Sequence, residues 1–143
     1  MPDSITHNPS RQIPADPRRI LFVRLSAVGD VINTLPALEA LRQSFPQAHI
    51  GYLVEDRAHT VIEGHPSVDE VILYPRKRWV GMLKQPRQWL NVWREFRALL
   101  RRLREPRYDA ALNYQSNLKG ALFAWLSKAH IRLGFAKNNS KEN

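Results

Sequence analysis

The chain has no cysteine among its 143 residues, which excludes disulfides, thiolate metal sites and cysteine nucleophiles. None of its five histidines forms a close pair with metal-ligand spacing, so we expect no metal ion. No run of about 18 apolar residues occurs, so a membrane-spanning helix is not expected. The polar N-terminus also lacks the apolar stretch of a secretory signal. The expected compartment is therefore the cytoplasm.

Two phosphate-binding signatures are also absent. The sequence contains neither the glycine-rich G-x-G-x-x-G pattern of dinucleotide-binding domains nor the P-loop pattern that ends in Gly-Lys-Ser/Thr. A nucleotide site within this chain is therefore unsupported.

What the chain has in excess is positive charge. Its formal net charge of +9 indicates an anionic partner. Nucleic acid, anionic lipid and a phosphorylated sugar acceptor all agree with this charge, which does not distinguish between them.

Short apolar runs alternate with helical periodicity along the chain. The expected strands are 20–23, 49–54, 70–74, 110–114 and 131–135. The expected helices are 31–44, 57–64, 87–104 and 118–128. Pro36 either kinks the first helix or lies in its first turn. Residues 1–17 are expected to form a flexible leader, 18–135 one domain, and 136–143 a frayed tail.

This alternation predicts an α/β fold with a Rossmann-like parallel sheet that is covered by helices on both faces. In such sheets ligands bind beyond the carboxyl ends of the strands. Three segments are expected there: the loop 25–30, the long basic loop 75–86 and the turn 115–119.

The segment between the first strand and first helix contains Arg24, Ser26, Gly29 and Asp30. Gly29 allows a tight turn or the close approach of a ligand, and Ser26 supplies a hydroxyl. Asp30 is either a helix N-cap or a general base at the mouth of the crevice. The two roles are compatible, because capping would hold the carboxylate in place.

Cations and amides follow in the other two segments. Arg76 and Arg78 suit a multiply anionic ligand, since a guanidinium grips phosphate or carboxylate in bidentate fashion. A solvated basic loop is the alternative. Gln115 and Lys119 are placed to face the same crevice, although Lys119 alone is better explained as an ordinary helix-surface lysine.

The helix 87–104 has a marked amphipathic pattern. Its apolar positions are expected to cover the sheet, with the arginines solvated on the opposite face. Attachment to a membrane surface is the alternative. The expected apolar face consists of Trp89, Val92, Trp93, Phe96, Leu99, Leu100 and Leu103.

Taken together, these segments resemble the ADP-heptose:lipopolysaccharide heptosyltransferase family. The most specific match is Ile20–Leu38, ILFVRLSAVGDVINTLPAL. Weaker matches follow in the family's order: Tyr52–Glu55, His65–Ile72, Arg107–Lys119 and Arg132–Phe135. The sequence departs from the family at Ser116, where the family has glycine.

The resemblance implies one lobe of a two-lobed, GT-B type glycosyltransferase. The N-terminal lobe would bind the anionic, lipid-linked inner core, and a C-terminal lobe absent from this chain would hold ADP-heptose. The family transfers heptose with inversion and without a metal or other cofactor. Its catalytic aspartate corresponds to Asp30, and its basic acceptor-binding segment to Arg76–Arg78. Arg24, Ser26, Gly29, Gln115 and Lys119 complete the expected substrate-binding set.

This chain alone is expected to be inactive, and peripheral contact with the cytoplasmic face of the inner membrane is a further expectation. Two other interpretations remain. A basic nucleic-acid-binding module agrees with the charge, but its usual sequence signatures are absent, so we expect no nucleic acid. A non-catalytic transferase remnant agrees with the missing lobe.

Overall fold

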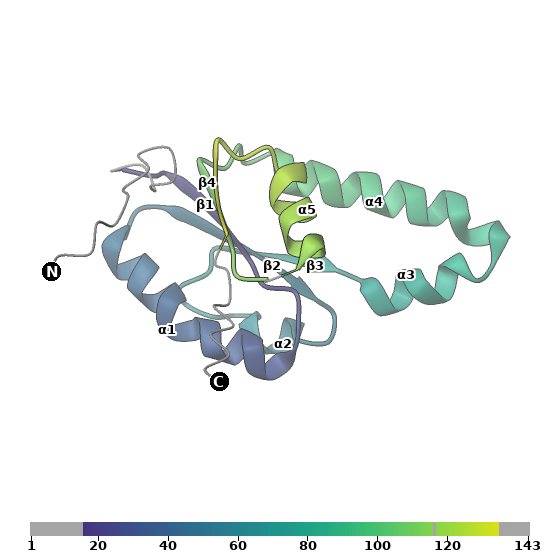
Figure 1. Cartoon of the computed structure of the whole chain (residues 1–143), viewed down its shortest axis with the longest axis horizontal. Helices are drawn as coiled ribbons and strands as arrows, with labels where there is room; N and C mark the ends of the chain where they lie inside the picture. Colours follow the sequence, from purple (N-terminus) through teal and green to yellow (C-terminus); the bar gives the residue numbers. More distant parts are fainter. Residues whose placement is uncertain (1–15, 116, 135–143) are drawn as a thin grey trace, which may run out of the picture.

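The computed structural model of the chain describes residues 16–115 and 117–134. Its centre is a parallel sheet of five strands in the order β3-β2-β1-β4-β5 (Figure 1). The strands are β1 (Arg19–Val23), β2 (His49–Glu55), β3 (Glu70–Tyr74), β4 (Ala110–Asn113) and β5 (Ile131–Gly134). The expected parallel sheet is therefore confirmed, with each strand within about one residue of its expected limits.

Helices lie on both faces of this sheet, as predicted (Figure 1). One face packs against α1 (Val28–Ser44) and α2 (His59–Ile62). The other packs against α4 (Trp89–Arg104) and α5 (Leu118–Leu126), with α3 (Arg76–Leu83) alongside α4. A short 3-10 turn, η2 (Pro86–Gln88), joins α3 to α4.

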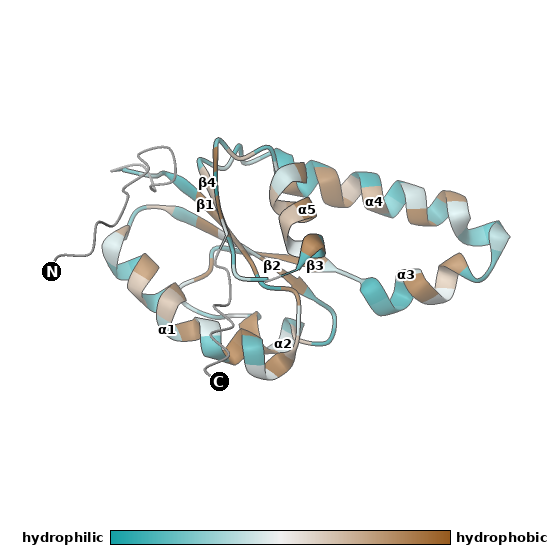
Figure 2. Cartoon of the chain, in the orientation of Figure 1, coloured by the Kyte–Doolittle hydropathy of each residue, from teal (hydrophilic) through white to brown (hydrophobic). Residues whose placement is uncertain are grey.

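The strands are apolar because both of their faces are covered (Figure 2). Alternate residues of β1 enter opposite cores: Leu21 and Val23 face α4 and α5, whereas Ile20 and Phe22 face α1 and α2. These four side chains have no solvent exposure. The order of the strands reverses between β1 and β4, and this reversal determines where a crevice can form.

Helix α1 begins at Val28, three residues before the expected start, so Gly29 and Asp30 are helical rather than loop residues. Pro36 lies in the interior of α1, where its missing N–H removes one backbone hydrogen bond. Of the two alternatives for Pro36, the first-turn position is therefore wrong.

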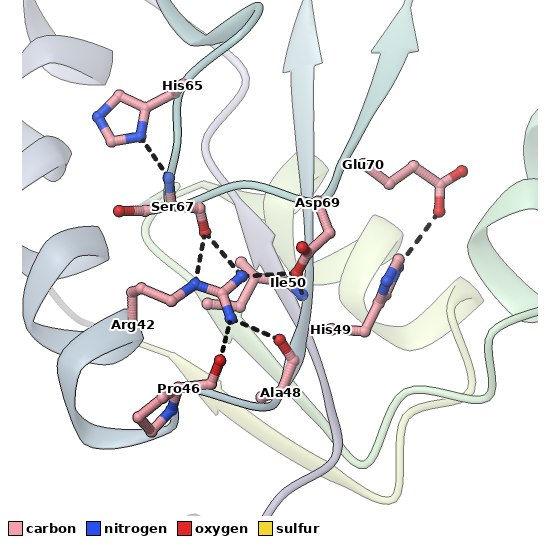
Figure 3. A network of polar contacts seen from close by, with 9 residues as sticks. All are labelled: Arg42, Pro46, Ala48, His49, Ile50, His65, Ser67, Asp69 and Glu70. Carbon is pink, nitrogen blue, oxygen red and sulfur yellow. Dashed lines mark hydrogen bonds and ion pairs between the residues drawn. The ribbon is translucent and has the colours of Figure 1, made fainter.

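The C-terminal end of α1 is tied to the sheet through Arg42 (Figure 3). Its guanidinium donates to the carbonyls of Ala48 and Ser67 and pairs with Asp69 at 2.5 Å. Asp69 in turn accepts a hydrogen bond from the backbone N–H of Ile50 at 2.8 Å. Burial acts to raise the pKa of Asp69, but these hydrogen bonds and the Arg42 charge outweigh it and lower the pKa.

The basic segment 75–86 was expected to be an exposed loop, and this expectation is wrong. Residues 76–83 form α3, because Trp79 provides a buried anchor against α4. The indole N–H of Trp79 donates to the Glu95 carboxylate at 2.6 Å, and its ring meets Phe96 edge-on. Helices α3 and α4 thus form a hairpin that projects beyond the sheet (Figure 1).

The expected apolar face of α4 is also partly wrong. Leu99 and Leu103 are buried against the sheet as predicted, but Trp89 and Trp93 are exposed. Sixteen residues of α-helix span about 24 Å, whereas the five residues of β3 span about 17 Å. The N-terminal part of α4 therefore extends past the end of the sheet (Figure 1).

Several expectations fall on residues outside the described ranges. They concern most of the leader, the tail, the last residue of the fifth strand and Ser116. Within the described ranges, no helix combines the length and the apolar composition that a bilayer crossing requires.

Candidate functional site

The candidate site lies at the carboxyl ends of β1 and β4, the two neighbouring strands between which the strand order reverses. The loop after β1 carries Arg24 and leads directly into α1. The loop after β4 carries Gln115 and leads into α5. Both loops follow paired parallel strands whose last four residues are buried, so the first residues of the loops are fixed by the core.

Arg24 connects these two loops. One guanidinium nitrogen donates to the backbone carbonyl of Tyr114, and another pairs with the Asp30 carboxylate at 2.7 Å. A second link runs the same way, because the backbone N–H of Leu25 donates to the Gln115 side-chain oxygen at 3.2 Å. Arg24 and Gln115 therefore hold the crevice together, in addition to any contact they make with a ligand.

Asp30 lies in the first turn of α1, as expected, with its side chain about half exposed. Its carboxylate accepts a hydrogen bond from the backbone N–H of Ala27 at 3.4 Å, which satisfies one of the unpaired donors at the helix start. Asp30 is thus the third residue of the helix rather than its N-cap. The ion pair with Arg24 and the N–H of Ala27 therefore hold this carboxylate in a defined orientation at the positive end of the helix dipole.

Ser26 and Gly29 flank Asp30 on the same segment. Ser26 is half-buried before the helix, and Gly29 lies in the first helical turn with open space around the position of a Cβ. Gly29 is therefore not needed for a tight turn, which corrects one of its two expected roles. The close approach of a ligand remains a prediction.

A buried carboxylate that the sequence analysis did not single out lies beside this segment. Glu55 ends β2 and is 2% exposed. Its carboxylate lies 3.8 Å from the Arg76 guanidinium and 3.6 Å from the Lys119 ammonium. Arg76 and Lys119, which are 43 residues apart in the sequence, are thus brought together as expected, but around a shared acidic partner. The only signal in the sequence was a glutamate that closes an apolar run.

Arg76 and Glu55 also line an open pocket of about 450 Å³, together with Asp56, Arg57, Lys77 and Val80. The Asp56 carboxylate accepts the backbone N–H of Lys77 at 3.1 Å and so supports the first turn of α3. Close by, burial raises the pKa of Tyr74, and the charge of Glu55 raises it further. This pocket concentrates cations that remain partly open to solvent.

Arg78 does not join this group. It lies two residues after Arg76 on α3, which places it on a different side of the helix. Its guanidinium pairs with Glu95 of α4 at 2.6 Å. The expectation that Arg76 and Arg78 face one crevice is therefore not met, although binding by either residue remains a prediction.

Among residues 16–115 and 117–134, no three acidic or histidine side chains gather as a group that could hold a metal ion. The expectation that no metal or other cofactor takes part is not tested by this finding. What the site offers is an oriented, half-exposed carboxylate beside cations that can bind an anion.

Comparisons with known proteins agree with this architecture. The profile of glycosyltransferase family 9 (heptosyltransferase) matches residues 96–142. The chain is 36% identical over 110 residues to lipopolysaccharide heptosyltransferase 1 of Pseudomonas aeruginosa, a match that covers 77% of the chain and 29% of that relative. It is 30% identical over 105 residues to lipopolysaccharide heptosyltransferase 1 of Escherichia coli, covering 72% of the chain and 31% of the relative.

Solved structures give the same result. The glycosyltransferase family 9 protein of Veillonella parvula superposes with a TM-score of 0.63 and 31% identity, over 83% of this chain and 32% of that one. E. coli heptosyltransferase WaaC with ADP-2-deoxy-2-fluoro heptose superposes with a TM-score of 0.69 and 27% identity, over 82% and 36%. The chain spans about a third of the length of the curated relatives it matches.

Proposed function

Because the chain belongs to glycosyltransferase family 9, the heptosyltransferases, we propose that it is the acceptor-side half of an enzyme that transfers heptose from an ADP-sugar to the lipopolysaccharide inner core. The observation that carries this proposal is the pair formed by Arg24 and Asp30 at the start of α1. It supplies an oriented base at the strand ends, the place where parallel α/β sheets bind their ligands.

In the proposed reaction, Asp30 takes the proton of an acceptor hydroxyl as that oxygen attacks the anomeric carbon. The new carbon–oxygen bond forms on the face opposite the leaving ADP, so the bond to ADP breaks with inversion. A positioned base of this kind contributes about a hundred- to ten-thousand-fold in rate. Arg24 keeps the Asp30 carboxylate oriented before the proton arrives.

The acceptor is proposed to be an anionic, lipid-linked saccharide. Arg76 and Lys119 would bind its phosphates or carboxylates beside the pocket at the end of β2. Glu55 lies between these two cations and limits their movement. Gln115, Ser26 and Gly29 would contribute polar groups and backbone access at the neighbouring loops, and Arg78 an outer charge near α4.

The ADP-heptose donor is proposed to bind a second lobe outside this chain, and no metal or other cofactor is proposed. The structural relative from E. coli was solved with an ADP-sugar analogue, and this chain covers 36% of it. The isolated chain is therefore proposed to bind acceptor weakly and to transfer nothing. Since the acceptor carries a lipid, we place the reaction at the cytoplasmic face of the inner membrane, with peripheral contact.

A chimera tests the proposal. The chain replaces the matching segment of the P. aeruginosa relative, so that this relative supplies the donor-binding lobe. Incubation with ADP-heptose and a heptose-free inner core should add the mass of one heptose to the acceptor, whereas the donor lobe alone should add none. A folded chimera that hydrolyses or ignores ADP-heptose would contradict the proposal.

Acceptor binding by the isolated chain gives a second test, which does not depend on how the two parts of the chimera are joined. Titration calorimetry should show weak acceptor binding that Arg76→Ala removes. Arg78→Ala should weaken binding less, because the Arg78 guanidinium is already paired with Glu95 at the far side of α3. Tight binding of nucleic acid in place of acceptor would favour the nucleic-acid alternative.

A further inference from the structure

The tip of the α3–α4 hairpin exposes large apolar side chains. Trp89 and Trp93 are 57% and 55% exposed, and Leu83 and Leu90 are exposed beside them. Trp89 and Trp93 are four residues apart on α4 and therefore share one face of the helix. Three of the four tryptophans in the chain lie in this hairpin, and of these three only Trp79 is buried.

This exposed face is held in a defined position rather than frayed. The indole N–H of Trp89 donates to the carbonyl of Leu83 at 2.9 Å and so links the end of α3 to the start of α4. On the inner side, the Trp79 indole and the Arg78 guanidinium both contact Glu95. The hairpin projects beyond the sheet (Figure 1), so the body of the described domain does not cover its tip.

The same hairpin concentrates the excess positive charge of the protein. Residues 75–104 contain ten of the 22 basic residues and one of the 13 acidic residues, so this segment alone accounts for the formal net charge of +9. Its single acid, Glu95, is already paired with Arg78. Four cations flank the exposed tryptophans in the sequence, namely Lys84, Arg87, Arg94 and Arg97. In the described part of the chain, no acid forms an ion pair with any of them.

We propose that this hairpin tip docks on the surface of an anionic lipid bilayer. The tip comprises the apolar side chains Leu83, Trp89, Leu90 and Trp93 and the cations Lys84, Arg87, Arg94 and Arg97. Tryptophan beside leucine on a helix, bordered by arginine and lysine, matches the chemistry of the headgroup boundary. The rings and leucines enter the acyl edge while the cations meet lipid phosphates.

The other possible partners fit this surface less well. The central part of a protein interface is poor in charged residues, whereas four cations without acidic partners border these tryptophans. A nucleic acid would satisfy the arginines and stack on the indoles, but it offers no apolar partner to Leu83 and Leu90. The bilayer matches both the charge and the aliphatic groups.

This inference deepens the proposed function, and it rests on that function only for the choice of the inner membrane. Helix α3 connects the tip to the acceptor pocket, since Arg76 at its first residue lines that pocket. Docking of the tip would therefore place the pocket near the lipid surface from which a lipid-linked acceptor is taken.

The test is co-sedimentation of the chain with lipid vesicles, without donor or acceptor. Vesicles of phosphatidylcholine and phosphatidylglycerol in equal parts should bind the protein, and phosphatidylcholine alone should bind it at least about tenfold more weakly. The double variant Trp89→Ser/Trp93→Ser should lose most of this binding, and so should Arg94→Gln/Arg97→Gln. Because all four side chains are exposed, the variants should stay folded. Their melting temperatures should fall by only a few degrees, since the tryptophan variant loses one exposed hydrogen bond to Leu83.

Matched controls distinguish vesicle binding by the tip from nonspecific adsorption through any exposed tryptophan or cation. Trp125→Ser removes a tryptophan of similar exposure (60%) on α5 and should bind vesicles like the wild type. Arg132→Gln/Lys128→Gln removes two exposed cations elsewhere and should have little effect. Equal binding to both vesicle types, or equal losses in tip and control variants, would overturn the proposal. Because no transfer is measured, a failed chimera leaves this result unaffected.

Discussion

The link between the two crevice loops can be tested by removing the Arg24 guanidinium. In Arg24→Met the side chain keeps most of its apolar stem, but it loses the donors to the Tyr114 carbonyl and to the Asp30 carboxylate. We expect the loop after β1 to loosen from the loop after β4, while the buried strands beneath them stay in register.

The expected loss of stability follows from the exposure of the two contacts. A hydrogen bond from a charged donor in a partly buried position contributes about 1.5–3 kcal/mol, and the Arg24 side chain is only 15% exposed. The ion pair adds at most about 1 kcal/mol, because Asp30 is half exposed. A total of about 2–3 kcal/mol corresponds to a melting temperature lowered by about 10 °C for a domain of this size.

Thermal melting followed by circular dichroism measures this directly on the isolated chain. Arg132→Met is the matched control, because Arg132 is exposed on β5. It should melt within about 2 °C of the wild type, in keeping with the small effects of most surface substitutions. If Arg24→Met also melted within about 2 °C of the wild type, the structural role of Arg24 would be refuted.

Three further predictions concern other parts of the fold. In the chimera, Glu55→Gln should lower kcat about tenfold, because Arg76 and Lys119 lose the carboxylate that orients them. The KM for acceptor should not rise, because the pocket gains net positive charge. Steady-state kinetics would measure both constants, and a raised KM would argue against this reasoning. Since the pKa of Asp69 is lowered in the folded state, its contribution should be present above about pH 4 and be lost as the pH falls through the folded-state pKa. The stability gap between wild type and Asp69→Asn in urea should therefore close in acid, and a gap independent of pH would contradict this. Gly51→Ala should cost about 2 kcal/mol or more in urea unfolding, because an added Cβ would lie 2.1 Å from the Tyr108 hydroxyl oxygen; an unchanged midpoint would refute the predicted clash.

The sheet could be predicted from the sequence because strands buried on both faces leave a continuous apolar signal, as in Ile20–Val23. The hairpin could not, because its helices depend on contacts between distant residues. Trp79 and Glu95 meet across α3 and α4, and this contact turns a basic stretch into a helix. Periodicity placed Trp89 and Trp93 on the same face as Leu99, but it carries no information about where the sheet ends.

The candidate site was predictable where a single strand–loop–helix unit supplies it, as for Arg24 and Asp30. Glu55 was missed because its importance comes from the positions of Arg76 and Lys119, which reach it from two other elements. Arg76 and Arg78 were grouped because they are near neighbours in sequence. A helix separates residues two positions apart, and only the structure shows that a helix forms there.

The most direct test of the proposed mechanism is Asp30→Asn in the chimera, with turnover and melting temperature measured on the same preparation. Asparagine keeps the shape of the side chain and can still accept the Ala27 N–H, and the pair it loses with Arg24 is half exposed. The melting temperature should therefore fall by no more than about 4 °C, the equivalent of about 1 kcal/mol. Turnover should fall about a hundredfold or more, because an amide cannot take the acceptor's proton. Near-normal turnover in Asp30→Asn would contradict the assignment of Asp30 as the base.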